Sequence, residues 1–314
     1  MEQLKEALSA AGIAYKENEP LCAHCTFRIG GPADLFVLPE NEEQLCAAIR
    51  LAKEAGVKSY LLGNGSNILF EDAGYRGAVI NVSAMKSGIG VIENISFPGK
   101  DPALTYDAVV VGAGQMLSSL CMAALENSLT GLEFAYGIPG TVGGAVYMNA
   151  GAYGGEMKQV VERVHFLEAD GTPGVMSGED LAFGYRKSAF MGTKRIITSA
   201  ELRLESGAEA EITAKMEGFM RRRREKQPLE LPSAGSVFKR PEGYFAGTLI
   251  EQCGLKGFAV GGACVSEKHA GFIVNKGGAT CADVEALIRA IQDTVFQATG
   301  VELEPEIRRI SLSE

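Results

Sequence analysis

Glycine is concentrated in one uncharged stretch, from Phe134 to Gly155, and this stretch limits what the chain can fold into. It holds seven glycines together with Pro139, too many helix breakers for the solid apolar run of a membrane-spanning helix. Ordering so many glycines is costly, because glycine loses more conformational freedom on folding than any other residue. The stretch therefore indicates backbone laid against a flat, extended, polar ligand.

The composition is that of a folded soluble protein. The chain of 314 residues is long enough for about two domains of ~150 residues each. Hydrophobic residues make up 46% and charged residues 22%, which is ordinary for a globular chain. A net charge of −9 argues against bulk electrostatic binding to nucleic acid or to an anionic membrane, so we expect neither partner.

The cysteines indicate a reducing compartment. The first residues carry no secretory signal, and the count of seven cysteines is odd, so we expect a cytoplasmic protein with reduced thiols. Cys22 and Cys25 form a C-x-x-C with His24 inside it, a pattern typical of a redox or zinc site or of two unrelated thiols. Because no second C-x-x-C exists and only His165 and His269 remain as ligands, we favour unrelated thiols and expect no metal.

Hydrophobic periodicity predicts an α+β fold class. Asn41 and Thr280 are expected to cap helices, and apolar stripes predict two more helices, 116–126 and one beginning at Glu209. The expected strands are 35–38, 60–62, 78–82, 89–92, 108–111, 161–167, 195–204, 271–275 and 307–310. The strand, helix and strand after residue 270 have the size of a βαβ-type unit. Domain boundaries are expected near residues 80 and 206.

A second glycine-rich segment, Gly63-Asn64-Gly65-Ser66-Asn67, directly follows the expected strand 60–62. Its successive N–H groups are suited to phosphate oxygens, although a plain tight turn is the alternative. It differs from the Rossmann fingerprint at Ile68, and no lysine follows in register for a Walker A loop. Together with the longer stretch, it predicts a dinucleotide lying across two glycine-rich segments.

Several polar residues outside these segments are candidates for chemistry. Arg186 follows a turn-like Ala-Phe-Gly in a region with few cations, and Ser236 lies among small residues with two cations nearby. No histidine falls near Ser236 along the chain, so a Ser-His-Asp triad is poorly supported. The basic run 221–226, at a helix end, is expected to be a solvated face or a local phosphate site rather than a nucleic-acid site, and Glu306 and Arg308 are expected on one face of a strand.

Five motifs occur in the order known from one enzyme family. They are Arg28-Ile-Gly-Gly-Pro-Ala, Leu62-Gly-Asn-Gly-Ser-Asn-Ile-Leu, the block beginning Gly137-Ile-Pro-Gly-Thr-Val-Gly-Gly, Gly235-Ser-Val-Phe-Lys-Arg-Pro and Leu303-Glu-Pro-Glu-Ile-Arg. Over nearly its whole length the chain resembles the UDP-N-acetylenolpyruvoylglucosamine reductases, also called UDP-N-acetylmuramate dehydrogenases. The short segment between Arg186 and Arg195 resembles the shorter class of that family, and residues 93–106 are expected to be a surface insertion.

The resemblance implies an FAD-binding fold of the vanillyl-alcohol-oxidase type. It implies two α/β FAD-binding subdomains, 1–80 and 81–206, and an α/β substrate-binding domain, 207–314, whose last strand returns to the active site. The implied reaction is the NADPH-dependent reduction of UDP-N-acetylglucosamine enolpyruvate to UDP-N-acetylmuramate in peptidoglycan precursor synthesis. FAD is expected to be noncovalent, since neither glycine-rich segment contains a histidine or cysteine for attachment. We expect a monomer or weak oligomer.

The resemblance also assigns roles to residues. Arg186, Ser236 and Glu306 are implied to be catalytic, with hydride passing from flavin N5 to the enolpyruvyl β-carbon and a proton from Ser236 to the α-carbon. The implied cofactor-binding residues are Gly63, Asn64, Gly65, Ser66, Asn67, Gly137, Ile138, Pro139, Gly140, Gly143, Gly144, Asn149, Ala150 and Gly151. The implied substrate-binding residues are Tyr185, Lys226, Arg240, Tyr244, Asn275 and Arg308. The alternatives are another flavin oxidase and a protein that binds a nucleotide sugar without turnover.

Overall fold

The structure is a computed structural model that describes residues 1–85, 88–95 and 106–311. The insertion expected at 93–106 lies for the most part outside these residues. The chain forms two compact units, each assembled from three stretches. The first unit comprises Met1–Tyr15, Val37–Gly63 and Ile80–Arg221, and the second comprises Lys16–Phe36, Asn64–Val79 and Arg222–Glu314. The three consecutive domains expected from the sequence remain a prediction.

A six-stranded antiparallel sheet forms the centre of the first unit. Its strand order is β12-β11-β13-β7-β6, and β8 pairs with β13. The strands are β6 (Ile89–Ile95), β7 (Tyr106–Gly112), β8 (Leu129–Thr130), β11 (Val161–Leu167), β12 (Pro173–Ser177) and β13 (Ile196–Ser206). The expected strands 89–92, 108–111, 161–167 and 195–204 are therefore confirmed.

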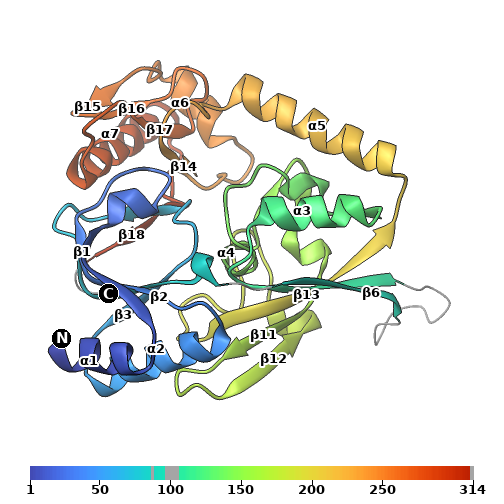
Figure 1. Cartoon of the computed structure of the whole chain (residues 1–314). Coiled ribbons are helices and arrows are strands. Elements are labelled where there is room, and N and C mark those ends of the chain that lie inside the picture. Colours follow the sequence, from blue (N-terminus) through green and yellow to red (C-terminus); the bar gives the residue numbers. More distant parts are fainter. Residues whose placement is uncertain (86–87, 96–105, 312–314) are drawn as a thin grey trace. The chain divides into compact units, whose positions relative to one another are not determined.

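Helices α3 (Leu117–Glu126) and α4 (Val142–Met148) lie on one face of this sheet (Figure 1). They bury Leu117, Leu120 and Val142 in one hydrophobic cluster. In β13, Ala200, Leu202 and Leu204 belong to the same cluster and alternate with more exposed residues. This period-two pattern directs one face of the strand toward the core. Helix α3 matches its expected range, whereas the short helix α4 lies inside the glycine-rich stretch, where no helix was expected.

Helices α1 (Glu2–Ala10) and α2 (Glu42–Glu54) also belong to the first unit. As expected, Asn41 caps α2, and its side chain accepts a hydrogen bond of 2.9 Å from the Gln44 N–H. Gly56 follows the helix with φ +64°, the left-handed conformation that glycine adopts at little cost. Helix α5 (Glu209–Lys226) begins in the first unit and ends in the second.

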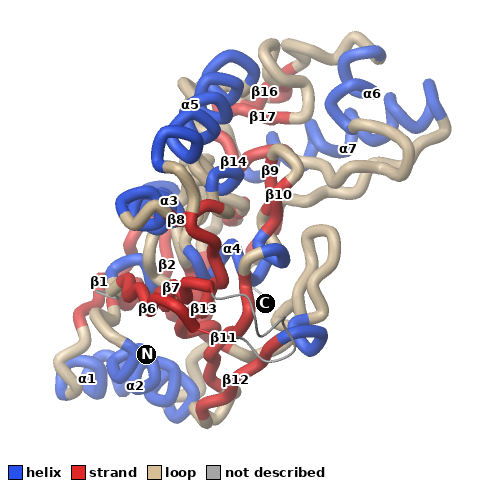
Figure 2. The backbone as a smooth tube through the Cα atoms, turned by 90° about the vertical axis from the view of Figure 1, so that its right-hand side faces the viewer, coloured by secondary structure: helices blue, strands red, loops and turns tan. Residues whose placement is uncertain are grey.

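The second unit contains a four-stranded sheet of order β14-β17-β16-β15. Figure 2 labels β14, β16 and β17 of this sheet and the helices α6 and α7 of the same unit. The elements are β14 (Ser233–Ser236), α6 (Ala246–Gln252), β15 (Ala259–Val260), β16 (Ala263–Val265), β17 (Phe272–Asn275) and α7 (Cys281–Thr299). The expected capping box of α7 is confirmed, since Thr280 and Asp283 exchange two hydrogen bonds of 3.0 Å.

The final strand β18 (Arg308–Ile310) pairs in parallel with β4 (Ile68–Phe70). It shares no described sheet with β17, so the expected βαβ-type unit is wrong. The chain after α7 instead runs along the segment that follows β14, where Pro305 bridges to Phe238 and the Lys239 N–H donates to Glu304. This detour carries the last strand to a different partner.

The remaining sheets are small. One has the order β1-β2-β5-β3, and the other is the hairpin of β9 and β10. Their strands are β1 (Ala14–Pro20), β2 (Pro32–Leu38), β3 (Ser59–Leu62), β5 (Tyr75–Asn81), β9 (Gly151–Ala152) and β10 (Gly155–Glu156). Among the described residues, no helix is both long and apolar enough to cross a membrane.

Candidate active site

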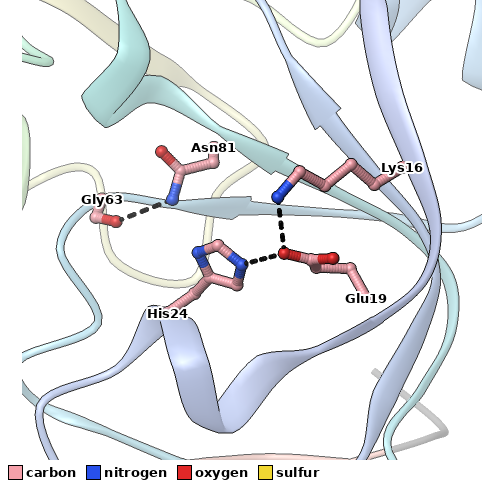
Figure 3. Close-up of polar contacts among 5 residues, drawn as sticks. All are labelled: Lys16, Glu19, His24, Gly63 and Asn81. Atoms are coloured by element: carbon pink, nitrogen blue, oxygen red, sulfur yellow. Dashed lines mark hydrogen bonds and ion pairs between the residues drawn. The ribbon is translucent and has the colours of Figure 1, made fainter.

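Gly63 directly follows the strand β3 of the first unit and has two close neighbours. Its carbonyl accepts a hydrogen bond of 3.2 Å from the buried Asn81 side chain (Figure 3). A β-carbon at position 63 would lie 2.6 Å from Thr141 Oγ1. Thr141 caps α4, so this glycine allows the first glycine-rich segment to contact the second closely.

The rest of the first segment, residues 64–67, belongs to the second unit. Gly65 is buried with φ +60°, and a β-carbon there would lie 2.4 Å from the His24 carbonyl oxygen. Within the described residues, the N–H groups of Gly65, Ser66 and Asn67 donate to no other residue. Three successive free donors can surround an anion, so the segment fits the pyrophosphate of FAD.

His24 lies beside this segment and takes part in a charged cluster (Figure 3). One carboxylate oxygen of Glu19 lies 2.8 Å from both Lys16 Nζ and His24 Nε2. Hydrogen bonds from Lys16 first and His24 second lower the pKa of Glu19. The His24 ring also stacks on Phe36 at a centroid distance of 4.0 Å. The imidazole thus has a carboxylate and an aromatic ring as partners.

The two thiols of the C-x-x-C are free. The buried Cys25 thiol donates to the Ile29 carbonyl at 3.3 Å, and burial raises its pKa. In the described part of the chain, no three His, Cys, Asp or Glu side chains are grouped to hold a metal ion.

Several glycines of the second segment are explained by packing within the protein. A β-carbon on Gly143 would lie 2.8 Å from that of Ala113, and one on Gly155 would lie 2.4 Å from the Phe134 ring. The expectation that so many glycines require a ligand was therefore too strong. The N–H groups of Gly137 and Thr141, however, donate to no other described residue, and they remain available to a cofactor.

Asn149 is fully buried at the C-terminal end of α4, with φ +43°. Its amide nitrogen donates to Gly184 O at 2.9 Å and to Glu156 Oε2 at 3.1 Å, and its oxygen accepts from the Lys158 N–H at 2.8 Å. The side chain thus ties the glycine-rich segment to the turn before Arg186. Because both polar atoms of the Asn149 side chain have protein partners, a cofactor at this position would contact the backbone.

Replacing Asn149 by alanine is expected to lower the free energy of unfolding by about 3 kcal/mol, because buried groups lose their partners. Asn149→Gly should cost about 1 kcal/mol less, since glycine adopts the left-handed conformation without strain. Urea unfolding followed by circular dichroism measures both values. Two variants as stable as the unmodified protein would show that the network contributes little.

Arg186 lies in a tight turn of the first unit. Gly184 and Lys187 exchange two backbone hydrogen bonds, which leaves Tyr185 and Arg186 at the tip. Arg186 has φ +52°, and its guanidinium donates to Gly151 O at 3.2 Å. The structure therefore brings the predicted catalytic cation to the second glycine-rich segment, while the Tyr185 side chain is exposed.

Ser236 and Glu306 are brought together in the second unit. The Glu306 N–H donates at 2.6 Å to the carbonyl of Val237, the residue after Ser236. Asn67 reinforces this arrangement, since its side chain donates to Glu306 O at 3.2 Å and its carbonyl accepts from the Arg308 N–H at 3.0 Å. Glu306 precedes β18, so the expectation that it shares a strand with Arg308 is wrong.

The predicted substrate-binding residues of the second unit differ in their surroundings. The Arg240 guanidinium lies 4.0 Å from the Phe245 ring centroid and donates to the carbonyl of the exposed Tyr244 at 3.3 Å. Lys226 is exposed at the end of α5. The Asn275 side chain is buried, where it donates to the Phe27 carbonyl at 3.2 Å and accepts two backbone N–H groups. Its amide therefore holds loops together.

One residue of the basic run departs from the solvated helix end that was expected. Arg223 is buried, with 6% of its surface exposed, and its Nη1 donates to Gln227 Oε1 at 3.4 Å. The sequence held a signal for this, because Arg223 continues the stripe of Met216 and Phe219 at helical spacing.

Comparisons with known proteins identify two families along the chain. Residues 33–175, which contain both glycine-rich segments, match the FAD binding domain family. Residues 227–310 match the UDP-N-acetylenolpyruvoylglucosamine reductase C-terminal domain family. The UDP-N-acetylenolpyruvoylglucosamine reductase of Clostridium perfringens strain SM101 is 45% identical, with 99% of each chain covered. That of Caldanaerobacter subterraneus is 44% identical over 98% of this chain and 97% of the relative.

A solved structure extends the comparison to three dimensions. The crystal structure of UDP-N-acetylenolpyruvylglucosamine reductase from Thermus caldophilus has a TM-score of 0.75 and 35% identity, covering 95% of this chain and 99% of that one. The predicted fold class, α+β with an FAD-binding part and a C-terminal domain, is confirmed, as is the predicted resemblance. The chain is an FAD-dependent oxidoreductase, and it belongs to the UDP-N-acetylenolpyruvoylglucosamine reductase family.

Proposed function

We propose that this chain reduces UDP-N-acetylglucosamine enolpyruvate to UDP-N-acetylmuramate, with NADPH as hydride donor, in cytoplasmic peptidoglycan precursor synthesis. The proposal is supported by the backbone hydrogen bond of 2.6 Å from the Glu306 N–H to the carbonyl of Val237, the residue after Ser236, in a chain that matches an FAD-binding domain. A protein that only bound a nucleotide sugar would not need this pair together with Arg186.

Each proposed catalytic residue has a separate task. The chemistry that FAD would supply when bound is hydride addition at the enolpyruvyl β-carbon, which would leave negative charge on the α-carbon and carboxylate of the substrate. The Arg186 guanidinium stabilises that charge, and Glu306 in its protonated form donates a hydrogen bond to the carboxylate. The Ser236 hydroxyl transfers its proton to the α-carbon and regains one from solvent, because a strongly basic enolate can be protonated by a weak acid.

The nucleotide sugar is assigned to side chains outside the catalytic group. Rings that can stack on the uracil and cations that can pair with the diphosphate are supplied by the five residues assigned to this part of the substrate. They are Tyr185, Lys226, Arg240, Tyr244 and Arg308. Asn275 acts indirectly, by holding the turn at Phe27 and Arg28 through its buried amide.

The proposed function can be tested by following the colour of the flavin during turnover. The holoenzyme should be yellow, lose its absorbance near 450 nm with NADPH, and regain it when the enolpyruvyl substrate is added. UDP-N-acetylglucosamine, which lacks the enolpyruvyl group, serves as the control and should not restore the colour. A colourless protein that cannot be reconstituted with FAD would instead support a nucleotide-sugar binding protein.

FAD is expected to bind without a covalent bond. Neither glycine-rich segment holds a histidine or cysteine, whereas free backbone donors are present at residues 65–67. Acid precipitation should therefore release all of the flavin into the supernatant. Yellow colour retained in the washed pellet would contradict this prediction.

A further inference from the structure

His269 lies close to Ser236 in the second unit, although the two are far apart along the chain. A β-carbon built on Gly271 would lie 3.0 Å from His269 Cε1 and 3.3 Å from Ser236 Oγ. The imidazole and the hydroxyl therefore border the same face of Gly271. No histidine is near Ser236 along the chain, as the sequence indicated, but His269 is near it in space.

Two glycines make room for this imidazole. A β-carbon on Gly247, in α6, would lie 3.2 Å from His269 Cε1, which is tighter than the usual contact of a β-carbon. The ring packs edge to face on Phe272 at a centroid distance of 4.9 Å. The imidazole is thus held in one orientation by its neighbours, as is typical of side chains that support a functional site.

A hydrogen-bonded path connects the ring to the serine. The Gly271 N–H donates to His269 Nδ1 at 3.1 Å. The Gly271 carbonyl accepts from the N–H of Val237 at 2.9 Å, and Ser236 is paired with Phe272 in the same sheet. Since Gly271 is held at its N–H by the imidazole and at its carbonyl by Val237, the ring helps to fix the strand end that carries Ser236.

The path requires a neutral imidazole, because a ring nitrogen that accepts a hydrogen bond cannot carry a proton. Burial lowers the pKa of His269 below its ordinary value. The charged groups that face it are Lys256 and Glu251, which form an ion pair of 2.6 Å. As the pH falls through the lowered pKa, Nδ1 gains a proton and its bond to Gly271 is lost.

We propose that His269 is a positioning residue for Ser236, which it holds in place through the Gly271 N–H only while its own ring is neutral. The inference rests on the proposed role of Ser236 as proton donor. His269 does not touch the reacting atoms. It affects the position of Ser236 through the backbone of residues 271 and 237.

Two variants of the holoenzyme separate this role from mere packing. His269→Ala removes the acceptor and should slow flavin reoxidation by the enolpyruvyl substrate about tenfold, with flavin reduction near normal. His269→Asn should recover most of that rate, because an asparagine oxygen accepts the N–H two residues further on. It should also abolish the loss of reoxidation rate that the unmodified enzyme shows as the pH falls through the lowered pKa of His269.

A second readout does not depend on turnover. The amide ¹H–¹⁵N resonance of Gly271 should shift with pH in unmodified holoenzyme and stay constant in His269→Asn. Failure of asparagine to rescue the rate, or a Gly271 resonance that ignores pH, would overturn the proposal.

The double variant His269→Ala/Ser236→Ala distinguishes failure of this inference from failure of the proposed function. It should reoxidise no more slowly than Ser236→Ala alone if His269 acts through the serine. A further tenfold loss would show that His269 acts independently. Normal reoxidation in Ser236→Ala would instead refute the proposed donor, while the Gly271 resonance would still report the hydrogen bond.

Discussion

Replacing Ser236 by alanine is expected to slow flavin reoxidation by the enolpyruvyl substrate while flavin reduction by NADPH stays near normal. A proton donor acts only in the half-reaction that protonates the substrate. General acid catalysis is typically worth ~10²–10⁴-fold, so we expect a loss of reoxidation rate within that range. Stopped-flow absorbance at 450 nm follows the two half-reactions separately.

Ser236→Cys is the matched control for this experiment. A thiol also donates a proton, so this variant should recover part of the lost rate. Within the described part of the chain, the Ser236 hydroxyl makes one long hydrogen bond, of 3.4 Å to Phe238 O, and its loss should disturb the fold little. If Ser236→Ala slows reduction as much as reoxidation, the serine shapes the flavin pocket and the assigned role is wrong.

Arg186→Ala and Arg186→Gly should each lower turnover by about 10²–10³-fold, as is typical when a group that stabilises developing negative charge is removed. The two variants should differ in stability. Arg186 has φ +52°, and a left-handed conformation costs a residue with a β-carbon about 1–2 kcal/mol relative to glycine. Arg186→Gly should therefore have the higher free energy of unfolding, which urea titration measures.

Arg186→Lys separates charge from shape in the same turn. It keeps a cation on a side chain of similar length but loses the planar guanidinium that donates to Gly151 O. We expect it to restore only part of the rate. Near-normal turnover in Arg186→Ala would remove this residue from the catalytic group, whatever the order of stabilities.

Local signals made some elements predictable from the sequence. The caps at Asn41 and Thr280 and the helical stripe of α5 depend on residues within one or two turns of each other, so the sequence displays them directly. The long strand β13 was likewise predictable, because buried and more exposed residues alternate from Thr198 to Leu204.

Other elements depend on contacts between distant segments. Helix α4 has two glycines in its first turn, and glycine is a poor helix former, so the sequence did not predict a helix there. The reason for Gly143 is a distant contact, because Ala113 packs too closely for a side chain at this position. Strands β15 and β16 are only two and three residues long, too short to show a period. The secondary structure of such short segments is determined by tertiary packing rather than by local propensity.

The candidate site shows the same division. Motifs supplied the residue types, but the geometry comes from long-range bonds such as the one between Asn67 and Glu306, which are 239 positions apart. Asn149 was expected to bind cofactor, yet its side chain has the partners Gly184 and Lys158, which lie outside its motif. His269 was dismissed because separation along the chain was taken for separation in space.

The pairing of β18 with β4 has a consequence for synthesis of the protein on the ribosome. About 240 residues separate the two strands, so at ~5–20 residues per second β4 must wait roughly 10–50 seconds for its partner to be translated. Until then the β4 edge that will bind β18 carries unpaired backbone groups, which invite pairing with another nascent chain. Chaperone binding during translation should therefore be strongest before the last codons are read.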